Sequence, residues 1–323
     1  MSEPERRPGP PWIMEEMVAA QPALPAPILA LGGDLAAAVR AAPEPVAVVG
    51  CGTSEHGAMA IAALLRRAGV DARPRQSLDA ADEPWPGLCI GVSHDGGTPA
   101  TQMALDAAET SALVTASDAG ADVVVRTPVH DDSWCHTVAY TSAILAGAAV
   151  AAELGLAGVD ADAATAVLEA PVEADGSLAG AARVLCAGAG AGEITARELA
   201  LKIAEGARIP TTAHHLETLL HGHLAGEDDR SALVLVAPAD GRVGRRAELA
   251  GRACSALGMP VHRLDVPEAP GLEALLGRLL GGAIALQRLT LALVAARGVN
   301  PDLIRREEGP YRAAAAAAES EPF

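Results

Sequence analysis

Two short polar segments of this sequence combine residue types that could bind or transform a small ligand. The first is SHDGGT at residues 93–98, which follows the apolar run LCIGV and precedes a helix-like pattern beginning near Thr98. A strand, a short polar loop and a helix N-terminus in this order form an anion site in many α/β proteins, because free N–H groups point out of the helix. Asp95 nevertheless places a carboxylate where the anion would lie. The loop therefore predicts a phosphate site, a damaged phosphate site, or a pocket for another ligand.

The second segment, ELALKIAEG at residues 198–206, carries charged side chains at helical spacing. Lys202 and Glu205 are three residues apart, and Glu198 and Lys202 are four apart, so one helix face holds both pairs. Such pairs usually lie on a protein surface, where each contributes about 0.2–0.5 kcal/mol. The spacing by itself is therefore weak evidence for a catalytic role.

Histidines are concentrated in HHLETLLHGH, residues 214–223. Four histidines so close together suggest zinc, but the segment has neither HExxH nor a cysteine pair. We expect most of these side chains to be polar surface or core residues. No metal site is predicted.

A glycine turn in GCGTSEHGA, residues 50–58, marks another junction between a strand and a helix. Gly52 permits a tight turn, and Ser54 is expected to cap the helix that follows. The dinucleotide pattern GxGxxG fails because position 55 is glutamate, and GAGAGE at 188–193 lacks the required spacing as well. No nicotinamide or other cofactor is therefore predicted.

These junctions belong to an alternation of short apolar strands and amphipathic helices. The strand candidates are continuous apolar runs, as in parallel sheets buried on both faces. They are residues 46–50, 88–93, 112–117 and 122–127 in the first half, and 231–238 and 259–266 in the second. The stretch VAVVGCGTSE recurs as VLCAGAGAGE at an offset of 138 residues, which aligns Gly50, Gly52 and Glu55 with Gly188, Gly190 and Glu193. An internal repeat of this kind predicts an α/β protein of two tandem doubly wound parallel-sheet units.

A polar zone punctuated by proline and glycine, residues 155–180, separates the two halves. The predicted boundaries are an N-terminal segment at 1–27, a first unit at 28–158, a second unit at 175–310 and a flexible tail at 311–323.

Composition restricts the classes of partner. Of 323 residues, 50% are hydrophobic and 2% aromatic, so we expect a core of alanine, leucine and valine. A net charge of −17 without clustered cations argues against nucleic acid. The five cysteines form no CxxC pair, the N-terminus shows no signal-peptide pattern, and no uncharged apolar run of about 18 residues occurs. We therefore expect a reduced, cytoplasmic protein with no membrane contact.

Several motifs occur in an order that leads to a family. Gly-Cys-Gly-Thr-Ser at 50–54 is followed, after the next strand, by Ser-x-x-Gly-x-Thr at 93–98. This combination resembles the sugar isomerase (SIS) domain family. Further segments are similar to the isomerase half of the glucosamine-fructose-6-phosphate aminotransferases in that family. They are MEEMVAAQP at 14–22, AYTS at 139–142, the stretch at 198–223 that includes ELALKIAEG and the histidine-rich segment, and NPD at 300–302. The likeness covers about residues 12–306.

The resemblance implies flavodoxin-like units, a homodimer and sugar-phosphate sites at the strand ends. The substrate contacts that it implies are Gly52, Thr53, Ser54, Ser93, His94, Asp95, Gly96 and Thr98. His94 and Asp95 stand where the family usually has glutamine and serine, and a carboxylate within about 4 Å of a phosphate is repulsive. Three outcomes follow. Asp95 pairs with His94 or another basic group while phosphate binds, or it accepts hydrogen bonds from an unphosphorylated sugar, or the site is inactive.

By the same resemblance, Glu205 is the base that moves a proton between C1 and C2 of an open-chain sugar. Lys202 would orient it or bond a substrate oxygen, and His221, which precedes a glycine, would open the ring in the partner subunit's site. The family's usual proline after that His-Gly pair is His223 here.

Two further departures bear on the reaction. The aminotransferases have Ser-Thr-Lys where this chain has His136, Thr137 and Val138, and their C-terminal lysine has no counterpart in LIRREEGPYR, residues 303–312. We therefore expect no complete aminotransferase chemistry. The expected function is a phosphosugar or aminosugar-phosphate isomerase, deaminase or deglycase acting on a small-molecule sugar. The alternatives are a non-catalytic sugar or sugar-phosphate sensor or regulatory subunit, and a lyase acting on an aminosugar.

Overall fold

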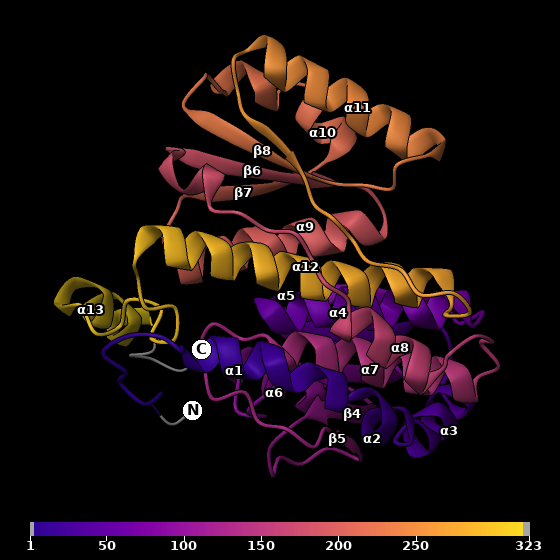
Figure 1. Cartoon of the computed structure of the whole chain (residues 1–323). Helices are drawn as coiled ribbons and strands as arrows, with labels where there is room; N and C mark the ends of the chain where they lie inside the picture. The colour runs from indigo at the N-terminus through magenta and orange to yellow at the C-terminus, as the bar shows by residue number, and fades with distance from the viewer. Residues whose placement is uncertain (1–2, 319–323) are drawn as a thin grey trace.

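The computed structural model describes residues 3–318 as an α/β protein with two parallel sheets, one in each lobe of Figure 1. The first sheet has the order β2-β1-β3-β4-β5, and its neighbouring strands pair in parallel. Its strands are β1 (Val46–Gly50), β2 (Ala72–Gln76), β3 (Leu88–Val92), β4 (Thr110–Thr115) and β5 (Val123–Arg126). Every residue of β1 and β3 is buried, which explains why these strands read as continuous apolar runs.

The second sheet repeats this order with one strand fewer, as β7-β6-β8-β9, again with parallel neighbours. Its strands are β6 (Arg183–Gly188), β7 (Thr211–His215), β8 (Ser231–Val236) and β9 (Val261–Arg263). The apolar runs predicted as strands all contain strands, with ends shifted by a few residues. The prediction missed β2 and β7 because both are sheet edges and carry polar residues (ARPRQ and TTAHH) in place of an apolar run.

Four helices fill the space between the two sheets. They are α4 (Thr53–Arg67), α7 (Val138–Glu153), α9 (Ala191–Lys202) and α12 (Ala274–Arg297). In Figure 1, α12 crosses the waist of the molecule, where it packs along α9 and also contacts α4 and α7. One continuous hydrophobic cluster includes Val48 of the first sheet and Val184 of the second. The two sheets thus share a helical core.

The outer face of each sheet has a smaller core of its own. The helices α5 (Ser77–Asp82) and α6 (Pro99–Asp106) cover the first sheet, while α10 (Leu216–Leu220) and α11 (Gly241–Ala256) cover the second. Both sheets therefore have helices on both faces, as the buried strands require.

The close approach of α12 to α9 depends on a glycine. A Cβ at Gly282 would lie 2.4 Å from Oγ1 of Thr195, so only glycine fits there without a shift. By length and composition α12 could cross a membrane, as could a bent pair of helical segments within residues 13–41. In α12, however, 72% of the apolar window is buried inside the protein. It therefore has the packing of a core helix.

The N-terminal helices are tied to distant parts of the chain. They are α1 (Ile13–Ala20), the 3₁₀ turn η1 (Gln21–Ala23), α2 (Pro25–Leu29) and α3 (Gly33–Ala41). The Asp302 carboxylate accepts the backbone N–H groups of Ile13 and Met14 at 2.9 and 2.8 Å and the Ser133 hydroxyl at 2.9 Å. The NPD segment therefore holds α1 against the loop that precedes α7.

The zone predicted to separate the halves has structure of its own. It contains α8 (Ala161–Glu169), which Asp160 caps by accepting the N–H of Ala163 at 2.8 Å, and the 3₁₀ turn η2 (Ser177–Gly180). The tail predicted to be flexible from residue 311 starts inside α13 (Gly309–Ala318), a helix with no buried residue. Residues 319–323 of that tail lie outside the described part of the chain.

Candidate functional site

Glycines at the end of β1 place the N-terminus of α4 against the strand. A Cβ at Gly50 would lie 2.3 Å from the carbonyl oxygen of Ser54, and Gly52 has a φ of +58°, which favours glycine. The repeat at 188–193 forms the same turn, since Gly190 has a φ of +59°. The prediction that Ser54 caps this helix is wrong. Gly52 occupies the cap position without a side-chain bond, and Ser54 lies in the first turn.

The loop after β3 is held by its own side chains. Ser93 is buried, and its hydroxyl lies 3.1 Å from Oγ1 of Thr98, the residue before α6. Gly96 has a φ of +66°, and a Cβ there would lie 2.2 Å from the Cβ of Ala119. Glycine is therefore required at position 96, both by the backbone conformation and by the lack of room for a Cβ.

Alanine at position 96 should destabilise the fold. We expect Gly96→Ala to lower the free energy of unfolding by about 2–4 kcal/mol, because it adds left-handed strain to an overlap with Ala119. Urea titration followed by circular dichroism measures the effect. Gly97→Ala is the control, because its nearest neighbour would be 3.9 Å away. Equal stability of the two variants would contradict this account of the loop.

The Asp95 carboxylate has a charged or polar partner in the folded protein. Its Oδ1 lies 2.8 Å from Nε2 of His130, whose other ring nitrogen is 3.5 Å from Asp132. The neighbouring His94 accepts the backbone N–H of Asp131 at 2.7 Å, and burial lowers its pKa to about 4. Asp95 is thus paired with a basic group, which is His130 and not His94.

The space beside this loop is small. Ser54, His94 and Ser142 are among the residues that line a cavity of about 10 Å³, which is room for about one water molecule. The hydroxyl of Ser142 is buried there with no hydrogen-bond partner in the described part of the chain. In this structure the cavity is too small to hold a phosphate group.

The charged side chains near the end of α9 are mostly buried, although the spacing of these residues in the sequence did not indicate it. The ammonium of Lys202 lies 2.5 Å from the Glu205 carboxylate and 3.7 Å from that of Glu198. The side chains of Lys202 and Glu198 are each 1% exposed, whereas that of Glu205 is 23% exposed. The spacing therefore produces a buried charged group with one accessible carboxylate, not a surface ion pair.

Glu205 lies in a distortion of the helix. After Lys202 the chain forms a π-helical turn, η3 (Ile203–Ala207), which ends at Arg208 in the left-handed conformation with a φ of +59°. Such π turns are often found at functional sites. Here the turn brings Glu205 back over Lys202 on the exposed side of the group.

Glu198 connects this group to the first unit. Its carboxylate accepts the Thr53 hydroxyl at 3.2 Å and lies 2.6 Å from Nδ1 of His56, both from the start of α4. The predicted contact residue Thr53 and the predicted catalytic Lys202 and Glu205 are therefore brought together from α4, α9 and the turn η3. Ser93 and Thr98 belong to the neighbouring loop of the first sheet.

Burial and charge act differently on the three ionisable groups. Burial alone would lower the pKa of Lys202, but Glu205 and Glu198 outweigh it and raise the pKa, so the ammonium stays charged. Burial would raise the pKa of Glu198, but Lys202 and His56 outweigh it and lower the pKa. The pKa of Glu205 is raised by burial despite the attraction of Lys202. Glu205 is therefore the carboxylate better suited to accept and return a proton.

Composition, and not spacing, contained a signal that Lys202 is unusual in this chain. Among 24 cationic residues it is the only lysine, and all others are arginine. Its ammonium is a compact point charge that contacts both carboxylates, whereas a guanidinium is a larger planar fork.

Other residues of the site were missed by sequence reasoning. The loop before α7 places Asp131, Cys135 and His136 beside this group. Asp131 is fully buried, accepts the N–H groups of Thr137 and Ala139 at 2.6 and 3.2 Å, and has a pKa raised by burial to about 6. A carboxylate seven residues ahead of a helix that accepts N–H groups at the helix start follows no local sequence pattern, so only the fold reveals it.

His221 is not brought to Glu205 within one chain. It ends α10, its side chain is 73% exposed, and its Nε2 lies 3.3 Å from Glu217. His215 caps α10 and His214 stacks on His223, which begins the 3₁₀ turn η4 (His223–Gly226). Among the described residues, no group of three histidine, cysteine, aspartate or glutamate side chains is arranged to hold a metal ion.

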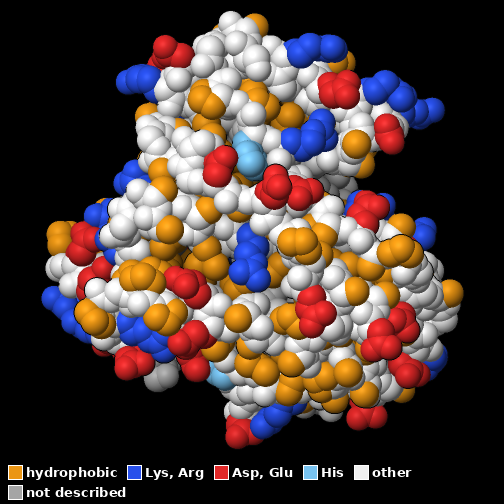
Figure 2. Space-filling view, in the orientation of Figure 1, with side chains coloured by type: hydrophobic (Ala, Val, Ile, Leu, Met, Phe, Trp, Pro, Cys, Tyr) orange, Lys and Arg blue, Asp and Glu red, His pale blue; other side chains and the backbone are white. Residues whose placement is uncertain are grey.

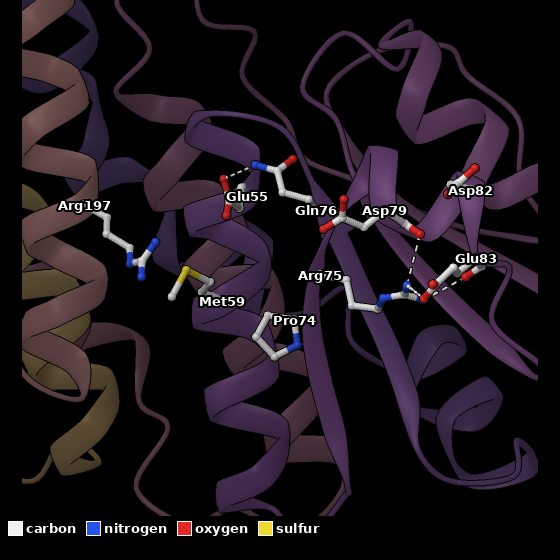
Figure 3. A pocket seen from close by; sticks show the side chains of 9 residues that line it. All are labelled: Glu55, Met59, Pro74, Arg75, Gln76, Asp79, Asp82, Glu83 and Arg197. Carbon is white, nitrogen blue, oxygen red and sulfur yellow. Dashed lines mark hydrogen bonds and ion pairs between the residues drawn. The ribbon is translucent and has the colours of Figure 1, made fainter. Parts of the chain in front are cut away.

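A larger cavity of about 530 Å³ lies on another side of α4, near the end of β2 (Figure 3). In that view Arg197 of α9 points towards Met59, and Glu55 bonds to Gln76. None of the predicted site residues lines it. On the face shown in Figure 2, basic and acidic side chains of the described residues are interspersed, and they form no continuous basic patch.

Three solved structures show the same fold across almost the whole chain. The C-terminal domain of glucosamine-fructose-6-phosphate aminotransferase from Francisella tularensis is 17% identical, with a TM-score of 0.74, over 92% of this chain and 99% of that one. Tagatose-6-phosphate ketose/aldose isomerase from Escherichia coli is 17% identical, with a TM-score of 0.73, over 90% and 95%. Glucosamine-6-phosphate deaminase from Thermotoga maritima is 14% identical, with a TM-score of 0.63, over 90% and 96%.

No family model matches the sequence, and no curated protein matches it. The likeness is therefore one of three-dimensional structure, with the motifs at 50–54 and 93–98 placed at the ends of β1 and β3 as the resemblance implied. The chain therefore has the same fold as these sugar-phosphate enzymes, and it is similar to them in structure over about nine-tenths of its length.

Proposed function

We propose that the protein is a phosphosugar or aminosugar-phosphate aldose–ketose isomerase that uses Glu205 for proton transfer between C1 and C2. The observation that carries this proposal is the buried group of Glu198, Lys202 and Glu205 beside Thr53. Structural relatives with this fold act, by their names, on tagatose 6-phosphate and glucosamine 6-phosphate. The deaminase among them supports deamination as a variant of the same chemistry.

The reaction needs one carboxylate that reaches both carbons. Glu205 takes the proton from C2 of an open-chain aldose, the electron pair forms the C1–C2 double bond of an enediol, and the same carboxyl returns the proton to C1. The proton on O2 passes to O1, which completes the ketose. Lys202 lies 2.5 Å from Glu205 and supplies the positive charge that stabilises the developing oxyanion. Glu198 holds that ammonium in place.

The proposal includes the oligomeric state and the cellular location of the protein. Two tandem doubly wound units would form a homodimer in which His221 reaches the partner's site, and its exposed position leaves it free to do so. All five cysteines are free thiols, which supports a reducing, cytoplasmic location.

A second candidate is a non-catalytic sugar or sugar-phosphate sensor. The C-terminal segment favours it, because Arg305 stands in the region where a lysine was expected. Its guanidinium bonds to Glu308 and stacks on Tyr311. An arginine that stays protonated cannot act as an amine or as a base.

A substrate panel separates the two functions. Glucosamine 6-phosphate, fructose 6-phosphate and tagatose 6-phosphate, with the unphosphorylated sugars beside them, are tested for turnover and for stabilisation in thermal-shift assays. Turnover of a phosphorylated sugar supports the isomerase or deaminase. Stabilisation without turnover of any member supports the sensor.

Asp95 is expected to weaken phosphate binding even though it is paired. We expect Asp95→Ser to lower the Kd of a phosphorylated sugar by about tenfold, because a carboxylate is removed and His130 is released to contact the phosphate. Asp118→Ser, an exposed aspartate paired with Arg126, is the control. If free sugars stabilise the wild type and phosphorylated sugars do not, the phosphate assignment is wrong.

A further inference from the structure

His136 is one of the groups of the site that the proposed mechanism leaves unused. Its Nε2 is buried and has no hydrogen-bond partner in the described part of the chain. Buried polar atoms in native structures are nearly always paired, and the exceptions often have a catalytic role. His136 directly precedes Thr137, the cap residue of α7.

His136 and the residue before it each lie close to another part of the site. Its ring centroid lies 5.3 Å from that of His94, in the loop after β3. The preceding residue, Cys135, packs on the π turn, since a Cβ at Gly206 would lie 3.4 Å from its Sγ. His136 therefore lies beside the predicted ligand loop, and the residue before it contacts the turn that carries Glu205.

Its surroundings keep the imidazole neutral. Burial, together with the charges of Lys202, His94 and His130, lowers the pKa of His136 to about 2. A neutral imidazole beside a fixed cation can lend a proton to an oxygen and take one back, whereas an imidazolium would be disfavoured.

We propose that His136 is a further catalytic residue, which relays the hydroxyl proton between O1 and O2 of the sugar while Glu205 moves the carbon-bound proton. This inference rests on the proposed isomerase function. As the C2–H bond breaks towards Glu205, the C1–O1 π pair takes the proton from Nε2. The O2–H proton then returns to Nε2 as the C2–O2 double bond forms, and Glu205 protonates C1. The carbon-bound proton is thus returned to the substrate, the O2 proton replaces the one that Nε2 gave to O1, and both Glu205 and His136 end as they began.

His136→Gln tests the assignment, because glutamine keeps a polar amide but cannot relay a proton. With the phosphorylated sugar that the wild type converts, we expect kcat to fall by about 100-fold or more and KM to change by less than about threefold. We expect the melting temperature to be preserved. The control is His262→Gln, a half-buried histidine of β9 in the second sheet. His136→Asn serves as a second variant if the glutamine variant folds poorly.

The outcomes separate this inference from the proposed function. A wild type that converts no sugar of the panel overturns both. A wild type that is active, with a His136→Gln kcat within about threefold of it, overturns only the role of His136. A fall in kcat that merely matches a fall in the folded fraction also overturns it, because the role would then be structural. Loss of kcat in a fully folded variant that still binds the sugar supports the relay.

Discussion

Replacing Glu205 with glutamine is expected to lower kcat by about 10³-fold or more, while the Kd of the sugar changes by less than about threefold. Glutamine has nearly the same shape and can still accept a hydrogen bond from Lys202, which lies 2.5 Å away in the native protein. It cannot accept a proton from carbon. The variant therefore removes the chemical step and keeps the packing.

Turnover and binding should be measured on the same preparations. Isomerisation or deamination of the panel sugars gives kcat, and isothermal titration with the preferred sugar gives the Kd. Glu193→Gln is a matched control, since that carboxylate lies on the same helix and pairs with exposed Arg197. Wild-type turnover in Glu205→Gln would remove Glu205 from the mechanism. Loss of binding along with turnover would assign it to substrate recognition.

Lys202→Met is expected to destabilise the folded protein by about 3–5 kcal/mol at neutral pH. The change removes the cation that lies against two carboxylates, of which Glu198 is 1% exposed. Breaking a buried pair from one side leaves a buried charge uncompensated, which costs more than the pair itself contributed. Turnover should be lost too, because the oxyanion has no cation.

The destabilisation should depend on pH in a defined direction. Without Lys202, the folded-state pKa values of Glu198 and Glu205 rise above those of the unfolded chain. A carboxyl with a raised folded-state pKa costs stability above that pKa, and the cost disappears below the unfolded value of about 4.3. The difference between Lys202→Met and wild type should therefore be largest at neutral pH and above, and should shrink as the pH falls.

Urea titrations from about pH 5 to about pH 8 measure this dependence. Arg197→Met is the control, because it removes an exposed cation from the same helix and should cost less than about 0.5 kcal/mol. Lys202→Arg keeps the charge but adds a planar fork where the native side chain is 1% exposed, and we expect it to restore only part of the stability. Equal stability of Lys202→Met and Arg197→Met at every pH would show that the buried charges are not coupled.

Much of the fold follows from local patterns in the sequence. Continuous apolar runs such as 46–50 and 88–93 become strands buried on both faces, and the glycines at 50 and 52 form the turn that the repeat at 188 and 190 shows again. Polar edge strands such as β2 and β7 lack these runs, so they were missed. Their place in the sheet depends on backbone pairing with β1 and β6, which leaves little trace in their own residues.

For the site, local sequence established which residue types are available: the SHDGGT loop, the spacing of Glu198, Lys202 and Glu205, and a single lysine in the whole chain. The roles of these residues depend on the packing of distant segments. That packing buried Glu198 against Thr53 and His56, which lie 145 and 142 residues away in sequence, and it turned Asp95 to His130. Burial and pairing of a charge depend on groups brought from distant segments, so spacing along one helix could not show that this ion pair is the centre of a site.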